Sequence, residues 1–319
     1  MNAAVVHSFA APPRYTAFAD PVPADGEFLV TVTAAGLHPI VRSLAKGAHY
    51  GSAGILPLVP GVDGVGRLPD GSRVYFGATH PPFGTFAERC VSTPATCLPI
   101  PDALDDVTVA AVMNPGMSSY GALTERIQFA AGESVLILGA TGSAGQLAVQ
   151  IAKRLGARRA VAAGRNPEAL EALESLGADA LISLDQDRDA LVAALREEIA
   201  GQKIDVVLDY VWGPPAEAVL AAIAQKGLDH AARRIRYVEI GSMAGQTISL
   251  PGATLRSSGL ELVGSGFGSV SMEHIFRALA LFLVEAAKQP FQFKACAAPL
   301  CDVESLWNAP ADARLVFQP

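Results

Sequence analysis

The chain has 319 residues, of which 50% are hydrophobic and 17% are charged, and its formal net charge is −7. This length allows two domains with large buried cores. Because the charge balance is acidic and no basic run occurs, we expect neither nucleic acid nor an anionic membrane surface as a partner. The chain also lacks an apolar run of the roughly 18 residues that a membrane-spanning helix needs.

The N-terminal segment and the cysteines indicate the cellular compartment in which the protein is located. The chain does not begin with a cationic stretch followed by an apolar core, so we expect no signal peptide. The cysteines also lack a spacing typical of a metal site or a redox pair. We therefore expect reduced thiols in a cytoplasmic protein. The cysteines are Cys90, Cys97, Cys296 and Cys301.

The first 110 or so residues are predicted to be rich in β-structure. Pro and Gly turns separate short apolar clusters, and no alternation of strands with helices is visible. We expect a Greek-key or barrel-like domain here. Helices over Asp105–Val112 and Ser118–Ile127 should follow it. The strands are expected at Ala3–His7, Phe28–Ala35, Leu58–Gly66, Arg73–Phe76 and Phe86–Val91.

From Ser134 onward, strands alternate with helices, which predicts an α/β doubly wound parallel sheet of six strands. A long helix over Ser271–Lys288 ends this part, and Ala313–Phe317 is typical of a further strand. The second domain is therefore expected to be inserted near the end of the first. The six strands are Val135–Leu138, Ala160–Ala163, Ala180–Ile182, Val206–Asp209, Tyr237–Ile240 and Glu261–Val263, and two of the helices between them are Pro167–Leu176 and Asp187–Ala200.

The stretch Val135–Gly156 combines a buried strand, a glycine-rich turn and a helix. Glycines let a backbone approach a pyrophosphate closely, and the unpaired N–H groups at a helix start bind the anion. The spacing is G-x-x-G-x-x-G rather than the strict G-x-G-x-x-G, but the strand–helix context favours a phosphate site over a purely structural turn. The backbone expected to bind the phosphates is that of Gly139, Thr141, Gly142, Ser143, Ala144 and Gly145.

The end of the second strand, Gly164-Arg165-Asn166, indicates which dinucleotide is bound. In this fold an acidic residue there would accept the ribose 2′-hydroxyl of NAD, whereas an arginine accommodates the 2′-phosphate of NADP. Arg165 supplies a fixed cation with several donors, and no acidic residue stands at the corner before Glu168. We therefore expect NADPH as the cofactor; the alternative is that Arg165 is a solvated surface residue.

At this point the chain resembles the medium-chain dehydrogenase/reductase superfamily, in its zinc-independent quinone oxidoreductase-like branch. The resemblance covers essentially the whole length. It is carried by Ala34–Gly51, Leu56–Leu68, Gly84–Ser92, Asn114–Leu123, Gly139–Ala157 and Leu176–Leu184. It implies a GroES-like β-rich catalytic domain over residues 1–115, completed by 286–319. A Rossmann domain over residues 116–285 would bind NADPH. It further implies a homodimer.

The resemblance also implies further contacts with the cofactor. Ser118 stands where the family usually has a threonine beside the nicotinamide, although the residue also suits a helix N-cap. Gly241 and Ser242 follow the fifth strand, where backbone groups meet the carboxamide. Val211 follows the fourth strand, at the carboxyl edge where ligands bind in such sheets. The segment Gly264–Ser269 is expected either to line the cofactor cleft that the resemblance implies between the two domains or to form part of the dimer edge.

Metal-dependent relatives place a cysteine where His38 stands, Gly-His-Glu where Gly61-Val62-Asp63 stands, and Cys or His near Asn114. Zinc takes three protein ligands of N, S or O type at a catalytic site, and Val62 offers none. A cluster of closely spaced cysteines for a structural zinc is also missing. We therefore expect no metal.

Tyr50 and His38 are the candidates for a proton donor. Tyr50 lies close to the position at which enoyl-reductase relatives have a tyrosine, and a phenol can donate to a developing enolate. His38 replaces the asparagine that quinone-reductase relatives show, and a histidine can donate a proton near neutral pH. The structural alternatives are an aromatic plug on a loop for Tyr50 and a core histidine for His38. His49 is a weaker candidate, and Arg42 could bind an acidic substrate or lie on a helix surface.

Three functions remain open. The first is an NADPH-dependent reductase of quinones or α,β-unsaturated carbonyl compounds. The second is a metal-free NADPH-dependent carbonyl reductase or alcohol dehydrogenase. The third is a non-catalytic NADPH-binding sensor. An intact cofactor site with possible proton donors favours catalysis on a small molecule.

Overall fold

The structure is a computed structural model that describes residues 1–224, 233–310 and 312–319. The chain divides into two compact units. The first consists of Met1–Pro115 and Leu279–Pro319, and the second of Gly116–Ala278. The second boundary thus falls within helix α8 (Met272–Lys288), a little before the 285/286 junction expected from the sequence.

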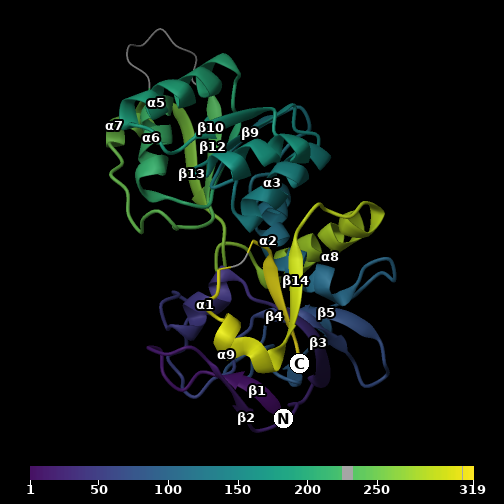
Figure 1. Ribbon diagram of the computed structural model, residues 1–319. Helices are drawn as coiled ribbons and strands as arrows, with labels where there is room; N and C mark the ends of the chain where they lie inside the picture. The colour runs from purple at the N-terminus through teal and green to yellow at the C-terminus, as the bar shows by residue number, and fades with distance from the viewer. Residues whose placement is uncertain (225–232, 311) are drawn as a thin grey trace. The chain divides into compact units, whose positions relative to one another are not determined.

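The first unit contains a seven-stranded mixed sheet in the order β14-β15-β3-β4-β5-β7, with β6 also paired to β3. The C-terminal strand β15 is antiparallel to β3 and parallel to β14, so the end of the chain completes the sheet (Figure 1). A separate hairpin joins β1 (Asn2–Val5) to β2 (Arg14–Ala17). The sheet strands are β3 (Phe28–Gly36), β4 (Asp63–Arg67), β5 (Arg73–Gly77), β6 (Arg89–Ser92), β7 (Cys97–Pro99), β14 (Ala295–Pro299) and β15 (Arg314–Gln318).

Two expected strands are shorter than predicted. The segment Leu58–Gly66 becomes a strand only from Asp63, and Leu58 makes an isolated bridge with Val6. In Phe86–Val91 the first residues are outside the ladder, because the Phe86 N–H donates to the Pro60 carbonyl instead. Prolines lack the N–H that a ladder requires, so Pro57 and Pro60 end the pairing on this segment.

The helix α2 (Asp106–Gly121) replaces the two helices expected over Asp105–Val112 and Ser118–Ile127. It runs through Pro115 without interruption and continues as a π-helical turn over Ala122–Arg126. Residues on both sides of the proline are buried, among them Met113 and Ser119. This packing outweighs the local preference for a break at Asn114-Pro115.

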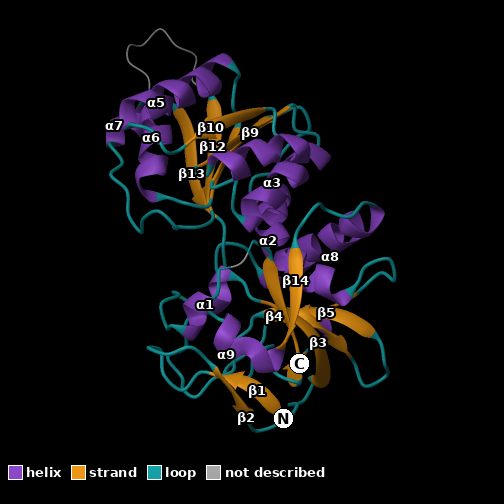
Figure 2. Cartoon of the chain, viewed as in Figure 1, coloured by secondary structure: helices purple, strands orange, loops and turns teal. Residues whose placement is uncertain are grey.

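The second unit confirms the predicted doubly wound sheet. Its six strands are all parallel, in the order β10-β9-β8-β11-β12-β13. Counted along the chain this is the order 3-2-1-4-5-6 of dinucleotide-binding folds. Figure 2 shows α5 (Arg188–Arg196) and α6 (Gly213–Ile223) on one side of the sheet and α3 (Ser143–Arg154) on the other. The strands are β8 (Ser134–Leu138), β9 (Arg159–Gly164), β10 (Ala180–Ser183), β11 (Val206–Asp209), β12 (Arg234–Glu239) and β13 (Gly259–Gly264).

The remaining helices cover the sheets or connect strands. The core of the second unit packs apolar residues of β8, β9 and β11 against α5 and α6. Within residues 1–224, 233–310 and 312–319, we find no helix with the length and apolar character to cross a bilayer. These helices are α1 (Pro39–Ala45), α3 (Ser143–Arg154), α4 (Pro167–Glu171), α5 (Arg188–Arg196), α6 (Gly213–Ile223), α7 (Gly252–Arg256) and α9 (Val303–Leu306).

Candidate functional site

The glycine turn between β8 and α3 has the backbone geometry of an anion site. Gly139 has a φ of +78°, which favours glycine, and its N–H and that of Ala140 both donate to the Ala163 carbonyl at 2.9 Å. Gly142 is the N-cap of α3, and no side chain caps the helix. The first N–H groups of this 12-residue helix are therefore available to an anionic ligand.

Two glycines let the turn pack closely against its neighbours. A Cβ at Gly145 would lie 2.4 Å from the Gly139 oxygen and 2.5 Å from the Ala140 Cα. A Cβ at Gly164 would lie 2.4 Å from the Thr141 methyl carbon. The close contact between Gly164 and Thr141 places the glycine turn beside the end of β9, where Arg165 follows.

Arg165 and Asn166 occupy the corner after β9. The Asn166 side chain caps α4 by accepting the Ala169 N–H at 2.9 Å, so Asn166 fixes the direction of the chain here. Arg165 is exposed and takes part in none of the ion pairs found among the residues that the structure describes. Its guanidinium is therefore free to meet a phosphate at this corner.

The carboxyl end of β11 lies next to the same turn. A Cβ at Gly139 would lie 2.8 Å from the Val211 side chain. Asp209 fixes the conformation of this segment. Its carboxylate accepts hydrogen bonds from the backbone N–H groups of Val211 at 2.8 Å and Trp212 at 2.9 Å. It also accepts a hydrogen bond from the Tyr237 hydroxyl at 2.6 Å. Burial raises the pKa of Asp209, while these donors lower it. A carboxylate directly after the apolar run of β11 is the signal by which sequence reasoning could have found this residue.

Tyr210 contacts two of the residues expected at the nicotinamide end, Ser118 and Gly241. Its hydroxyl lies 3.2 Å from the Ser118 Oγ, and its carbonyl oxygen would lie 3.0 Å from a Cβ at Gly241. Desolvation raises the pKa of Tyr210 to about 12, so its hydroxyl stays protonated at neutral pH. Ser118 lies within α2 rather than at an N-cap. Ser242, next to Gly241, is half-buried. Tyr210 was not anticipated from the sequence.

In the first unit, His38 and Asp63 form a buried polar cluster. The His38 Nε2 lies 3.8 Å from the Asp63 Oδ1, and the Tyr75 hydroxyl donates to the Asp63 Oδ2 at 2.7 Å. Asn114 also hydrogen-bonds the Asp63 carboxyl. Burial raises the pKa of Asp63 to about 7, against the lowering effects of Tyr75, Arg314 and Asn114.

The environment of His38 determines its protonation state. The side chain is 1% exposed and stands at the N-cap of α1. Burial, together with the positive charge of Arg314, lowers the pKa of His38 well below its usual range. His38 is therefore neutral at pH 7, so this environment does not support an imidazolium donor; a neutral imidazole donates only through its single N–H.

Tyr50 lies beyond the other end of α1 and is 74% exposed. Its ring is tilted against that of His49, with the ring centroids 4.1 Å apart. His49 in turn accepts the Gly51 N–H at 3.0 Å, and burial lowers the pKa of His49. Tyr50 and His38 thus lie at opposite ends of one short helix rather than in one cluster.

The residues at the position of the catalytic zinc in metal-dependent relatives do not fit that ion. Within the described part of the chain, no group of three or more His, Cys, Asp or Glu residues is placed to hold a metal. Val62 has no donor atom, and the amide of Asn114 is engaged with Asp63. The Arg314 guanidinium acts electrostatically on both His38 and Asp63, and a bound cation would be repelled by it.

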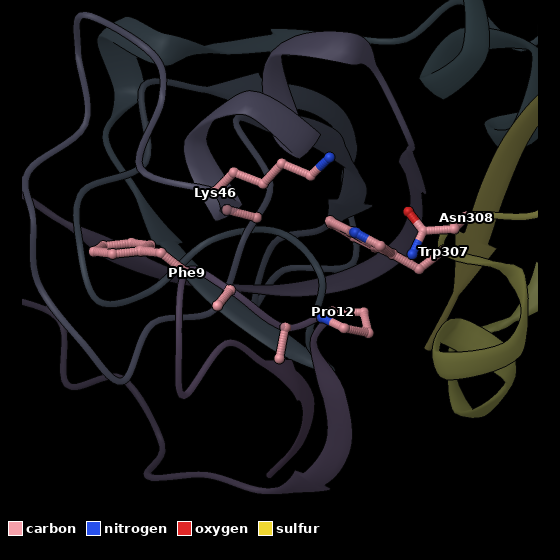
Figure 3. Close-up of a pocket in the computed structure, with 8 residues that line it drawn as sticks. Phe9, Pro12, Lys46, Trp307 and Asn308 are labelled. Atoms are coloured by element: carbon pink, nitrogen blue, oxygen red, sulfur yellow. The ribbon is translucent and has the colours of Figure 1, made fainter.

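A small pocket also opens in the first unit (Figure 3). Its volume of about 210 Å³ is below the roughly 300–1,000 Å³ typical of small-molecule sites. Its lining contains none of the residues expected at the site, so we do not assign it a role. The lining residues are Phe9, Ala10, Ala11, Pro12, Ala45, Lys46, Trp307 and Asn308.

A family model described as zinc-binding dehydrogenase matches residues 144–285. The chain is 28% identical to a protein of Emericella nidulans named as a probable NADPH-dependent quinone reductase, over 97% of this chain and 96% of that protein. It is also 28% identical to the chloroplastic NADPH-dependent alkenal/one oxidoreductase of Arabidopsis thaliana, over 59% of this chain and 50% of that protein.

Solved structures give the same relationship. The quinone oxidoreductase of Thermus thermophilus is 25% identical with a TM-score of 0.82, and the match covers 100% of both chains. A probable oxidoreductase of Mycobacterium abscessus is 25% identical with a TM-score of 0.81, covering 100% of this chain and 99% of that one. Over its whole length the chain is therefore similar to quinone oxidoreductases of the medium-chain dehydrogenase/reductase superfamily, and it is an oxidoreductase.

Proposed function

We propose that this oxidoreductase transfers a hydride from NADPH to a quinone or an α,β-unsaturated carbonyl acceptor without zinc. The observation that carries this proposal is the polar cluster of the first unit. A catalytic zinc would need three ligands there, whereas the structure has His38, the hydrogen-bonded Asp63 and the positive charge of Arg314. The names of the relatives, quinone reductase and alkenal/one oxidoreductase, support the same acceptor class.

The second unit would hold the cofactor. When bound, NADPH supplies the hydride from its nicotinamide ring. The helix start at Gly142 would bind the pyrophosphate, and Arg165 would bind the 2′-phosphate. Val211, Gly241 and Ser118 would line the nicotinamide end, where Tyr210 fixes the Ser118 hydroxyl.

The proposed chemistry needs a hydrogen-bond donor rather than a Lewis acid. Hydride addition to a ketone produces an alkoxide, which a metal ion stabilises strongly. Addition to a conjugated acceptor produces an enolate or a hydroquinone anion, in which the charge is delocalised. We assign proton donation to the exposed Tyr50 hydroxyl; the second candidate, His38, is neutral and would donate only a hydrogen bond through its single N–H. We also expect the protein to be located in the cytoplasm and to form a homodimer.

The test is oxidation of NADPH in the presence of three acceptor panels: 1,4-quinones, 2-enones and simple ketones. We expect turnover of quinones or enones, with activity retained after treatment with a chelator and no stoichiometric zinc in the purified protein. Activity on ketones alone would support a metal-free carbonyl reductase instead. Binding of NADPH without turnover of any panel would support a non-catalytic sensor.

Replacing Tyr50 tests the proton donor. Tyr50→Phe should lower kcat for enones by about a hundredfold, because an enolate is basic and needs the proton. It should lower kcat for quinones less than about tenfold, because a hydroquinone anion is a weaker base. The matched control is His49→Phe, which changes the neighbouring ring. Equal losses for both acceptors would contradict this role for Tyr50.

A further inference from the structure

Two arginines of the first unit, Arg42 and Arg314, both contact the segment at the start of α1, and neither forms an ion pair with a carboxylate among the described residues. Arg42 belongs to α1, one helical turn after His38, and Arg314 begins β15. The two guanidinium groups repel each other, since the charge of Arg42 lowers the pKa of Arg314. Within the described residues the Nε of each is enclosed and has no hydrogen-bond partner.

The surroundings do not neutralise these charges. Other arginines of the protein, such as Arg73 and Arg159, have a carboxylate within 3.2 and 2.8 Å, whereas Arg42 and Arg314 occur in none of the ion pairs of the described residues. Arg314 donates to the Leu37 carbonyl at 2.7 Å, which is a neutral partner. Asp63 attracts Arg314, but it carries only part of a negative charge at neutral pH because its pKa is about 7.

Partly buried like charges without a counterion are unfavourable. In line with this, burial and Arg42 lower the pKa of Arg314 to about 10, and burial lowers the pKa of Arg42. Although the Nε atoms are enclosed, each arginine as a whole is only half-buried, so an anion would reach the exposed part of its side chain. An ionised Asp63 would leave a net charge of about one positive unit, which a monoanion balances.

We propose that Arg42 and Arg314 bind a carboxylate on the acceptor molecule. Resting on the proposed function, this inference narrows the substrate to an enone or quinone that carries a carboxylate. Two planar guanidinium groups match the two oxygens of a carboxylate, each through parallel N–H donors. Because Arg42 lies one turn from His38, the bound carboxylate would orient the acceptor beside the polar cluster.

The test compares 4-oxopent-2-enoate with its methyl ester as acceptors for the NADPH-loaded protein. We expect kcat/KM to be about ten- to a hundredfold higher for the acid than for the ester. Arg42→Gln should abolish this preference by lowering kcat/KM for the acid to the level of the ester. The control Lys46→Gln removes a cation just beyond the end of the same helix and should keep the preference.

Arg314→Lys retains the charge but loses the planar fork, and should weaken the preference partly. Equal kcat/KM for acid and ester in the unchanged protein would overturn the proposal. A higher KM for NADPH in Arg42→Gln, with the acid preference intact, would assign the pair to a phosphate of the dinucleotide instead and would also overturn it.

If the proposed reductase function is wrong, a binding experiment still tests the arginine pair. If neither acceptor is reduced, titration calorimetry with the acid and the ester in the presence of NADP⁺ still measures the site. Binding of the acid that Arg42→Gln removes would support the arginine pair even then. Equal binding of acid and ester would contradict it.

Discussion

Asp63 is a buried carboxylic acid that is held by the Tyr75 hydroxyl and the Asn114 amide. The charged and titratable groups around it are His38, Tyr75 and Arg314. In an unfolded chain its pKa would be near 3.9, but in the folded protein it is about 7. Between these two pH values the folded state binds more protons than the unfolded state. The free energy of unfolding therefore falls as the pH rises through this range.

We predict that Asp63→Asn removes this pH dependence. The variant keeps an oxygen that can accept the Tyr75 hydroxyl but does not ionise. The free energy of unfolding of the variant minus that of the unchanged protein should increase by about 3 kcal/mol as the pH rises from 5 to 8. His38, whose pKa is lowered, acts in the opposite direction below its unfolded pKa, so the difference between the two proteins is the quantity to measure.

Urea unfolding followed by the fluorescence of Trp307 measures this difference, with Trp212 replaced by phenylalanine in both proteins. The control is Asp70→Asn, because the Ser72 N–H lowers the pKa of the exposed Asp70. The difference in unfolding free energy between Asp70→Asn and the unchanged protein should stay constant between pH 5 and pH 8, because the lowered pKa places the titration of Asp70 below this range. A pH-independent difference for Asp63→Asn would show that Asp63 is not protonated in the folded protein.

Side-chain contacts of this kind are the part of the site that the sequence did not reveal. Ser118 and Tyr210 are 92 positions apart, and their contact depends on α2 and β11 packing together within the second unit. Asp63 and Tyr75 meet because β4 and β5 pair in register, which a strand pattern alone does not specify. The position of Gly142 at the start of α3, in contrast, follows from a local sequence motif.

At the scale of elements, the close packing between the β8–α3 turn and the start of α3 depends on Gly145 more than on Gly142. Gly145→Ala would place a methyl group 2.4 Å from the Gly139 oxygen and 2.5 Å from a backbone carbon, neither of which can move freely. We predict a loss of about 1–3 kcal/mol in the free energy of unfolding. Urea unfolding without cofactor measures it.

Gly142→Ala is the matched control in the same turn. Its φ of −76° suits any residue, and the added carbon would lie 3.4 Å from the Gly139 oxygen. The expected loss is less than about 1 kcal/mol. Similar losses for the two variants would contradict the close packing at Gly145.

The elements themselves were predictable where local pattern and tertiary packing agree. The parallel strands of the second unit are short apolar runs bounded by turn signals, and the sheet confirms them. The helix α2 was predicted as two helices because Asn114-Pro115 favours a break, but burial on both sides of Pro115 keeps it whole. The strands β2, β7 and β14 were missed, since they are short and lack an apolar alternation.

At the scale of the whole molecule, the two units differ in how the chain builds them. The second unit is one continuous segment, whereas the first needs residues from both ends of the chain. Each unit has its own apolar core, one around Phe76, Phe86 and Trp307 and the other around Leu136, Leu138 and Tyr237. A ligand that binds only to the second unit should therefore stabilise that core directly.

The same cluster at Asp63 predicts how the molecule responds to zinc. Added zinc should not raise the thermal unfolding midpoint, because the cluster already contains the positive charge of Arg314. Scanning calorimetry with and without the ion measures this. A rise caused by zinc would contradict the zinc-free assignment.

We predict that NADPH raises the thermal unfolding midpoint of the protein and that NADH raises it less. A ligand present at about 100 times its Kd stabilises the state that binds it by about 2.7 kcal/mol, or about 5 °C or more for a unit of this size. Scanning calorimetry with equal concentrations of the two dinucleotides measures the difference.

In Arg165→Ala this difference should disappear, because the variant lacks the cation that directly follows β9. Lys153→Ala is the control, since Lys153 pairs with Asp179 and should alter both midpoints equally. Equal shifts by NADPH and NADH in the unchanged protein would contradict the role of Arg165.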